Sequence, residues 1–171
     1  SLLSAFNTIN SGFQVAVMAP TEILAKQHYN LAQKIFPKNL KIDLISGKSD
    51  LSDKKIIQKK LLEHKIDIIF GTHAIFQKKI IFKKLGLIII DEQHKFGVNQ
   101  RKMLSDKGGS DCDVLLMTAT PIPRTLTMTM YGDMDLSIIR EKPNIRKPVK
   151  TYSKLENKIN DVISFLRKEI K

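Results

Sequence analysis

The sequence predicts an α/β fold in which helices cover both faces of a doubly wound, mostly parallel sheet. Three short segments, at 15–18, 87–90 and 114–117, are runs of apolar residues without polar alternation. Both faces of such a strand must be covered, as in a parallel sheet between helices. Segments with helical spacing separate these runs, and this alternation is typical of doubly wound folds. We expect the middle run to be an interior strand between the other two.

The N-terminal segment is expected to be helical. Apolar residues recur at helical spacing from Leu2 to Ile9, and Gly12 follows as a stop signal. No capping residue opens this helix. We therefore expect it to be the end of a helix that begins earlier, in a fold that is incomplete at its N-terminus.

A second helix is expected after the strand at 15–18. Thr21 can serve as its N-cap, and Pro37 closes it after Phe36. One face of this helix is expected to pack on the sheet, and its members are Ile23, Leu24, Gln27, Leu31 and Ile35.

The middle of the chain repeats the alternation of strand and helix. A strand at 41–45 precedes a lysine-rich helix, which we expect to be capped near Ser52 and to turn Ile56, Ile57 and Leu61 inward. The segment at 80–85 is ambiguous. The other expected elements are strands at 66–70, 87–91, 114–117 and 136–139, and a helix at 124–131.

The composition changes after residue 140. Pro143, Pro148 and the basic residues around them predict an extended linker over 141–150. Apolar residues then recur at helical spacing over 155–170, and such a stripe needs a partner. We expect residues 1–140 to form one domain and residues 151–171 to start a second.

Composition favours a cytoplasmic protein with a polyanionic partner. The net charge is +12, although the lysines are spread along helices, where a solvated face explains them equally well. No apolar run approaches the roughly 18 residues of a membrane span, and no signal peptide is visible. The single cysteine, Cys112, cannot form an internal disulfide.

A pair of carboxylates, Asp91 and Glu92, directly follows the apolar run at 87–90. Ligands bind at the carboxyl ends of the strands in open α/β sheets. There Asp91 can hold Mg²⁺ through the water of the ion, and Glu92 can orient or deprotonate an attacking water. A helix that begins with acidic residues has the same letters, so that alternative stays open at this point.

Three further blocks also follow expected strands, at 18–22, 71–73 and 118–121. Each block alone is an ordinary turn or helix start. Four such blocks in this order and at these intervals, counting the one at 91–94, are hard to obtain by chance.

The four blocks resemble motifs Ia, Ic, II and III of the RecG branch of superfamily 2 DNA helicases. The matching segments, in order, are MAPTEILAKQHY, GTHAIFQ, IIIDEQHKFGVNQR and LLMTATPIPRTL. The resemblance implies a RecA-like fold, ATP and Mg²⁺ as ligands, and the remodelling of branched DNA, such as forks and Holliday junctions, in recombination and repair. The transcription-repair coupling translocase is the alternative. It shares PIPRTL and FGV but more often has DEEH and a different motif Ia.

The resemblance also implies roles for particular residues. The catalytic set is Asp91, Glu92, Gln93 and His94, with Asp91 associated with Mg²⁺ through water. The residues that would couple the ATP and DNA sites are Thr118, Thr120 and Arg124. The residues that would lie along the DNA are Ala19, Pro20, Thr21, Glu22, Gly71, Thr72 and His73.

The sequence departs from the family in the phosphate-binding loop. No G-x-x-x-x-G-K-S/T occurs in it, and although Gly47-Lys48-Ser49 matches the end of that motif, Ile42 stands where its first glycine belongs. That loop cradles the β- and γ-phosphates. We therefore expect a fragment of the first motor domain that does not hydrolyse ATP alone and whose partner is the rest of the helicase.

Two hypotheses of other classes remain. One is a basic DNA-binding α/β module that has lost ATPase function. The other is a metal-dependent hydrolase that uses Asp91, Glu92 and His94, which lie unusually close together on one loop for a metal site.

Overall fold

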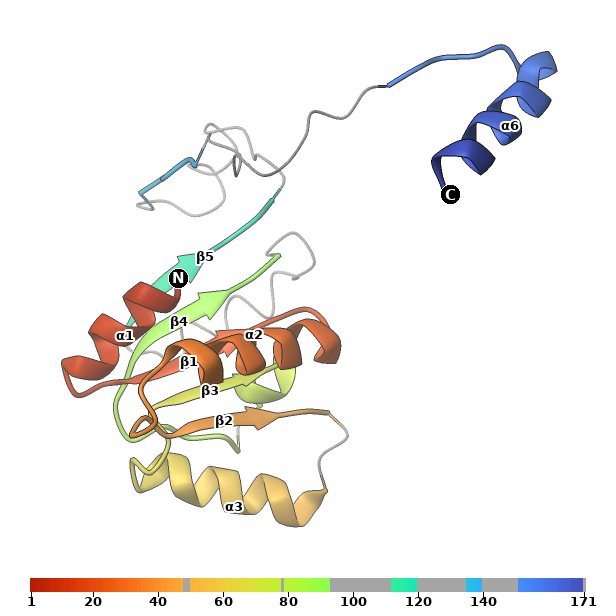
Figure 1. Ribbon diagram of the computed structural model, residues 1–171. Coiled ribbons are helices and arrows are strands. Elements are labelled where there is room, and N and C mark those ends of the chain that lie inside the picture. Colours follow the sequence, from red (N-terminus) through yellow and green to blue (C-terminus); the bar gives the residue numbers. More distant parts are fainter. Residues whose placement is uncertain (48–49, 78, 93–111, 120–134, 140–150, 171) are drawn as a thin grey trace. The chain divides into compact units, whose positions relative to one another are not determined.

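A parallel sheet forms the centre of the N-terminal part of the chain. The computed structural model describes residues 1–47, 50–77, 79–92, 112–119, 135–139 and 151–170. The strands are β1 (Gln14–Met18), β2 (Ile42–Ile45), β3 (Ile68–Gly71), β4 (Leu85–Ile90) and β5 (Asp113–Leu116). Their order is β2-β3-β1-β4-β5, with every pair parallel (Figure 1). The expected interior strand is confirmed, because β4 lies between β1 and β5.

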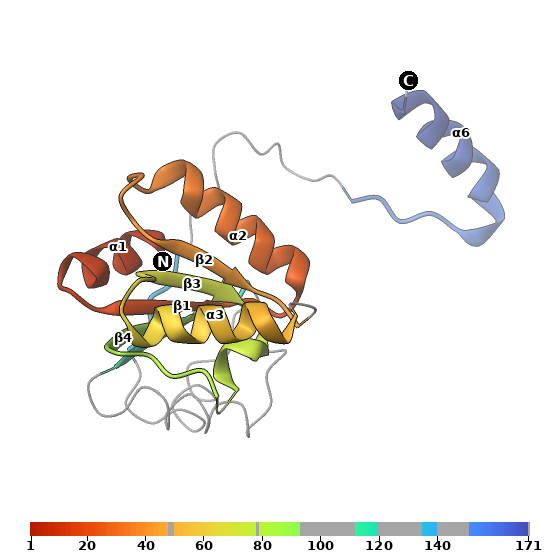
Figure 2. The ribbon, with the colours of Figure 1, turned by 90° about the horizontal axis from the view of Figure 1, so that it is seen from below.

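Helices cover both faces of this sheet. They are α1 (Leu2–Asn10), α2 (Glu22–Ile35), α3 (Leu51–Leu62) and the 3-10 helix η1 (His73–Phe76). Figure 2 shows α2 and α3 on opposite sides of the strands. Successive strand residues alternate between two cores: Val15 and Val17 pack with α1 and α2, while Ala16 and Met18 pack with α3 and η1. The doubly wound arrangement is therefore confirmed, since both faces of β1 are buried.

Helix α2 begins as expected but presents a different face to the sheet. Thr21 is its N-cap, and its Oγ1 accepts a hydrogen bond from the backbone N of Leu24 over 3.3 Å. The expected inward face is wrong: the side chains of Ile23, Leu31 and Ile35 are 73%, 46% and 59% exposed. The helix instead packs through small residues, with Ala25 and Ala32 fully or almost fully buried. Alanine lets a helix approach a sheet closely, and hydropathy alone cannot show this.

The lysine-rich helix α3 is confirmed, with two corrections. Its N-cap is Asp50 rather than Ser52. Ile57 and Leu61 are buried as expected, but Ile56 is 53% exposed. Adjacent residues do not face the same way on a helix, so only one of the two neighbouring isoleucines can reach the core.

A buried glutamine closes the amino end of the sheet. Gln14 has no exposed surface. Its Nε2 donates to the carbonyl oxygens of Leu61 and Ile66 over 3.0 and 2.9 Å, and its Oε1 accepts from the backbone N of Lys83 and Lys84 over 2.9 and 3.1 Å. One side chain thus joins the end of α3, the approach to β3 and the segment before β4, with both ends of its amide satisfied.

The chain divides into two compact units, residues 1–122 and 123–171, each described by itself. In the second, the expected amphipathic helix is present as α6 (Ile159–Glu169), preceded by η3 (Glu156–Lys158), and its apolar residues are exposed. The strand expected at 136–139 is wrong: the structure assigns no regular element there, and no described strand pairs with it. A strand needs such a hydrogen-bonded neighbour. The helix at 124–131 and the linker at 141–150 lie outside the described residues, and the division at residue 140 stays a prediction.

Candidate active site

The parallel sheet brings the predicted functional blocks to one edge, because the carboxyl ends of parallel strands point the same way. Hydrogen bonds continue beyond the strand ends and tie three of the blocks together. The backbone N of Ala19 donates to the carbonyl of Gly71 over 2.9 Å, and that of Asp91 donates to the carbonyl of Met18 over 2.9 Å. Thr118 follows the end of β5 at the same edge. Gln93, His94, Thr120 and Arg124 lie outside the described residues.

Asp91 is held from several directions at the end of β4. One carboxylate oxygen, Oδ1, accepts a hydrogen bond from the backbone N of Glu92 over 3.0 Å. The other, Oδ2, lies 2.8 Å from Nε2 of His28 on α2. Glu92 has a positive φ of 52°, so the chain turns sharply after the strand. The carboxylate is therefore oriented by the protein and remains partly open, with 21% of the Asp91 side chain exposed.

Sequence reasoning missed His28, and the reason is the misassigned face of α2. His28 follows Ala25 by three residues and precedes Ala32 by four, so it lies on the stripe that packs against the sheet. With Ile23 and Leu31 taken as the inward face, His28 had no reason to meet Asp91. The spacing from the two alanines is the signal that could have found it.

The residues expected along the DNA differ in exposure, and Pro20 and Glu22 are half-buried. Ala19, Gly71 and Thr72 are buried, so they can offer mainly backbone groups, whereas Thr21 and His73 are exposed. Gly71 also has a structural reason to be glycine. A Cβ there would lie 2.4 Å from the carbonyl oxygen of Ile45, which is closer than atoms can approach.

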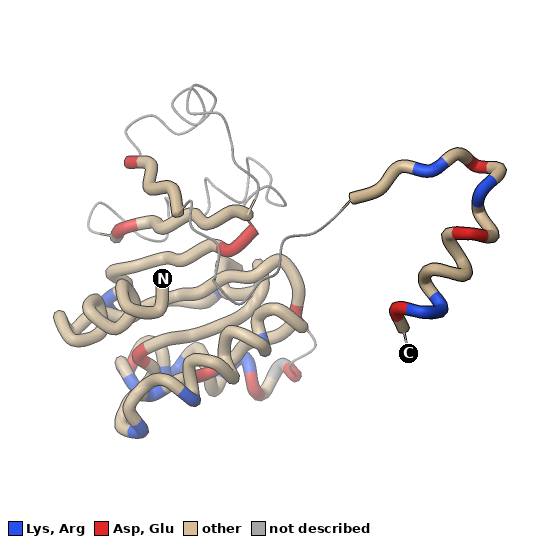
Figure 3. Tube along the Cα trace, turned by 45° about the horizontal axis from the view of Figure 1, so that its top comes forward, with Lys and Arg blue, Asp and Glu red and all other residues tan. Residues whose placement is uncertain are grey.

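Charge at this edge is mixed. Asp91 and Glu92 are acidic. Glu22, the first residue of α2, adds a third carboxylate, and its Oε1 lies beside Gly47, 3.4 Å from the position that a Cβ on this glycine would take. Lys54 Nζ donates to the carbonyl of Gly47 over 2.9 Å. The other lysines that the structure describes in the first unit are spread along its helices and loops rather than gathered at the edge (Figure 3). Positive charge therefore supports binding of a polyanion over a broad surface rather than at one point.

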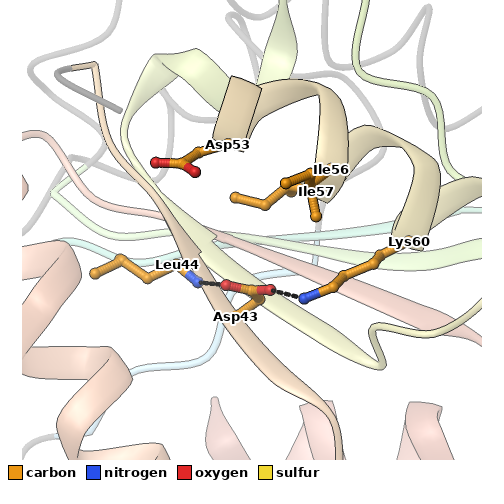
Figure 4. A pocket seen from close by; sticks show the side chains of 6 residues that line it. All are labelled: Asp43, Leu44, Asp53, Ile56, Ile57 and Lys60. Atoms are coloured by element: carbon orange, nitrogen blue, oxygen red, sulfur yellow. Dashed lines mark hydrogen bonds and ion pairs between the residues drawn. The ribbon is translucent and has the colours of Figure 1, made fainter. Parts of the chain in front are cut away.

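Two other features are separate from this edge. A pocket of about 280 Å³ lies between β2 and α3, where Asp43 Oδ2 is 3.6 Å from Lys60 Nζ (Figure 4). None of its lining residues belongs to the predicted site. Burial, followed by the charge of Asp113, raises the pKa of the Cys112 thiol to about 11, so this thiol stays protonated and is a poor nucleophile.

The described residues hold no group of three His, Cys, Asp or Glu side chains placed to bind a metal ion. The hypothesis of a metal-dependent hydrolase is not tested by them, because His94 lies outside the described residues. A single oriented carboxylate such as Asp91 does fit the way in which Mg²⁺ is held with nucleotides, through one or two carboxylates, several waters and the phosphates themselves.

Comparison with known proteins identifies the family. Residues 1–129 match the DEAD/DEAH box helicase family, so the chain belongs to these helicases. Within them it is similar to RecG. The ATP-dependent DNA helicase RecG of Streptococcus pneumoniae is 46% identical over 98% of this chain, and that of Borreliella burgdorferi is 44% identical over 99%. The chain spans about a quarter of the length of these relatives, 25% in both cases.

Solved structures agree with this assignment. A structure of RecG bound to a three-way DNA junction matches 99% of this chain and 23% of that one, with 38% identity and a TM-score of 0.79. The Mycobacterium smegmatis helicase Lhr, at 14% identity over 64% of this chain and 15% of that one, has a TM-score of 0.51 and shows the fold alone. The predicted RecG resemblance and the RecA-like fold are thus confirmed.

Within the described residues, no helix has the length and apolar character needed to cross a membrane.

Proposed function

We propose that this chain is part of the first motor domain of an ATP-dependent DNA helicase that remodels branched DNA. The observation that carries the proposal is the edge where the carboxylate pair follows β4 and the backbone N of Asp91 donates to the carbonyl of Met18, in the block at 18–22. The RecG relatives support an ATP-dependent DNA helicase, and the RecG structure with a three-way DNA junction supports a branched substrate. On this proposal residues 1–140 belong to the first motor domain and residues 151–171 begin the second.

The carboxylate pair would divide the work of hydrolysis. Asp91, oriented by its hydrogen bonds to Glu92 and His28, would hold Mg²⁺ through the water of the ion. The ion supplies positive charge that offsets the charge developing on the phosphates. Glu92 would orient the attacking water and accept its proton. Thr118, with Gln93, His94, Thr120 and Arg124, would connect this site to the DNA.

DNA would be bound through its phosphates at the neighbouring blocks. Backbone N–H groups at the start of α2, around Thr21, and at the turn formed by Gly71, Thr72 and His73 are suited to phosphate oxygens. Such contacts do not report base identity. They therefore suit a translocase, which must move over any sequence.

ATP turnover should require more than these residues. Because the chain contains no G-x-x-x-x-G-K-S/T, nothing in it positions the phosphates against Glu92. We expect negligible hydrolysis by the 171-residue chain, with or without DNA. A longer protein that adds a phosphate-binding loop and a second motor domain should hydrolyse ATP.

The decisive test is Glu92→Gln in that longer protein. Turnover should fall by about 10²- to 10⁴-fold, the usual contribution of a general base, while ATP binding is retained. Glu63→Gln is the matched control, because Glu63 is an exposed carboxylate that pairs with Lys65 over 2.6 Å, at the C-cap of α3. Hydrolysis by the 171-residue chain well above that of its own Glu92→Gln variant would refute the proposed dependence on the missing loop.

A further inference from the structure

Among the described residues, His28 of α2 is the side chain from outside the strand ends that reaches Asp91. Its Nε2 lies 2.8 Å from Asp91 Oδ2, although 63 residues separate the two in sequence. Both side chains are mostly covered, with 28% of His28 and 21% of Asp91 exposed. A hydrogen bond that is largely shielded from water is more directional and more consequential than one on an open surface.

The position of this imidazole is set by the packing of α2. His28 lies on the same stripe as Ala25 and Ala32, which are 2% and 0% exposed against the sheet. The adjacent residue, Tyr29, meets Phe70 of β3 edge-on, with ring centroids 6.2 Å apart. The packing of α2 against the sheet therefore fixes where the His28 ring lies relative to Asp91.

His28 completes the support of Asp91. The backbone N of Asp91 is held by Met18, and Oδ1 accepts a hydrogen bond from the N of Glu92. Among the described residues, His28 is the donor to Oδ2, and together with the N–H of Glu92 it fixes the rotation of the carboxylate about the Cβ–Cγ bond. A carboxylate has about four lone-pair sites, so both oxygens still have capacity for the water around a metal ion.

We propose that His28 is a positioning residue, which donates its Nε2 hydrogen to Asp91 and orients that carboxylate for hydrated Mg²⁺. This inference rests on the proposed function, because it gives Asp91 the role described above. Partners of this kind, which orient a metal-binding side chain, typically change metal affinity about 10- to 100-fold when they are removed. Thr21 is the N-cap of α2, so the helix that carries His28 to Asp91 also begins at the proposed DNA-binding edge.

A Mg²⁺ titration of ATP hydrolysis tests this role in the longer protein described above. We expect His28→Ala to raise the Mg²⁺ concentration at half-maximal rate by about 10- to 100-fold. His28→Gln should recover most of the loss, because the glutamine Nε2 can donate at a similar position. Asn30→Ala is the control, since Asn30 is exposed on the same helix and points away from His28. A half-maximal concentration for His28→Ala within about twofold of wild type would overturn the proposal.

Glu92→Gln, assayed beside these variants, separates the two proposals. If Glu92→Gln no longer hydrolyses ATP and the Mg²⁺ titration of His28→Ala matches that of wild type, the positioning role fails and the proposed function stands. If Glu92→Gln hydrolyses ATP at the wild-type rate, the proposed function itself fails.

A second readout needs neither ATP nor Mg²⁺. Nitrogen-15 NMR of the histidine rings in the 171-residue chain should show His28 protonated at Nε2. Asp91→Ala should shift the His28 ring signals and leave those of His64 in place, with an otherwise unchanged amide spectrum showing that the fold is retained. His28 ring signals that are identical in wild type and Asp91→Ala would contradict the hydrogen bond on which the proposal depends.

Discussion

The two ends of the sheet each carry a polar side chain beside the apolar core, Gln14 at the amino end and Asp91 at the carboxyl end. The two side chains differ in their exposure and in their hydrogen-bond partners. Gln14 has no exposed surface, and backbone groups of four other residues occupy its amide. Asp91 is 21% exposed and shares its carboxylate with His28 and Glu92. The amino end is thus closed for stability, while the carboxyl end keeps polar atoms within reach of a ligand.

Gln14→Leu should break the closed end, with the largest effect on stability. The substitution removes four hydrogen bonds at once and places an apolar side chain against the carbonyl and N–H groups that made them. We expect a loss of roughly 3 kcal/mol or more, over a hundredfold in the folding equilibrium. Chemical denaturation measures it. Gln33→Leu is the control, because Gln33 is an exposed glutamine that donates to the Tyr29 hydroxyl within α2, and the change should alter stability by less than about 0.5 kcal/mol. Equal losses of stability in the two variants would show that the buried amide of Gln14 does not close the amino end of the sheet.

Cys112, just before β5, should react slowly. Burial raises its pKa from 9.0 to about 11, so at pH 8 the reactive thiolate is about a hundredfold scarcer than for an ordinary thiol. Alkylation by iodoacetamide should therefore be slow in the folded protein and accelerate on unfolding. Because the folded pKa is raised, the associated stability is complete below pH 9 and is lost as the pH rises through about 11. A fast reaction at pH 8 in native conditions would contradict this.

Gly71→Ala should destabilise the carboxyl end by about 2 kcal/mol, or roughly 30-fold, through overpacking. The added Cβ would lie 2.4 Å from the backbone oxygen of Ile45, which cannot move without shifting β2. Gly86→Ala is the matching change at the amino end. Its Cβ would lie 2.6 Å from the Cβ of Phe13, which does not move when the Phe13 side chain rotates, so the cost should be similar. Thermal unfolding of both variants, with Gly47→Ala as an uncrowded control, checks that both lose stability and the control does not.

DNA affinity should show a modest but clear salt dependence. If the two blocks around Thr21 and Gly71 contact roughly two phosphates, affinity should fall about tenfold between 50 and 200 mM salt, following a log–log slope of about −0.9 per phosphate. Titrations on two unrelated duplexes should coincide, because phosphate contacts carry no sequence information. A flat salt response, or a strong preference for one duplex, would favour a specific binding module over a motor fragment.

Strands were the most predictable part of this molecule. An uninterrupted apolar run, such as that at 87–90, has few stable solutions other than a strand covered on both faces, and β4 is that strand. The placement of Asp91 and Glu92 at its carboxyl end followed from the same pattern. Helix sidedness was less predictable, because α2 approaches the sheet through alanines and leaves Ile23 and Leu31 outside.

The contacts that define the two ends could not be read from local spacing. His28 and Asp91 are 63 residues apart, and Gln14 reaches partners 47 to 70 residues away. Helix and strand periodicities report neighbours within a few positions, so they are silent about such pairs. The segment at 136–139 also shows that a local pattern is insufficient. An apolar run becomes a strand only when a neighbouring strand is available to pair with it.

The separations spanned by Gln14 also bear on how the sheet folds. Its amide can be satisfied only after α3, the approach to β3 and the segment before β4 have all been brought together, which requires closing loops of 47 to 70 residues. Interactions that depend on so many distant segments tend to form after the rate-limiting step of folding. Loss of the amide should therefore leave the folding rate almost unchanged and accelerate unfolding, so that Gln14 governs the lifetime of the native sheet more than the speed of its assembly.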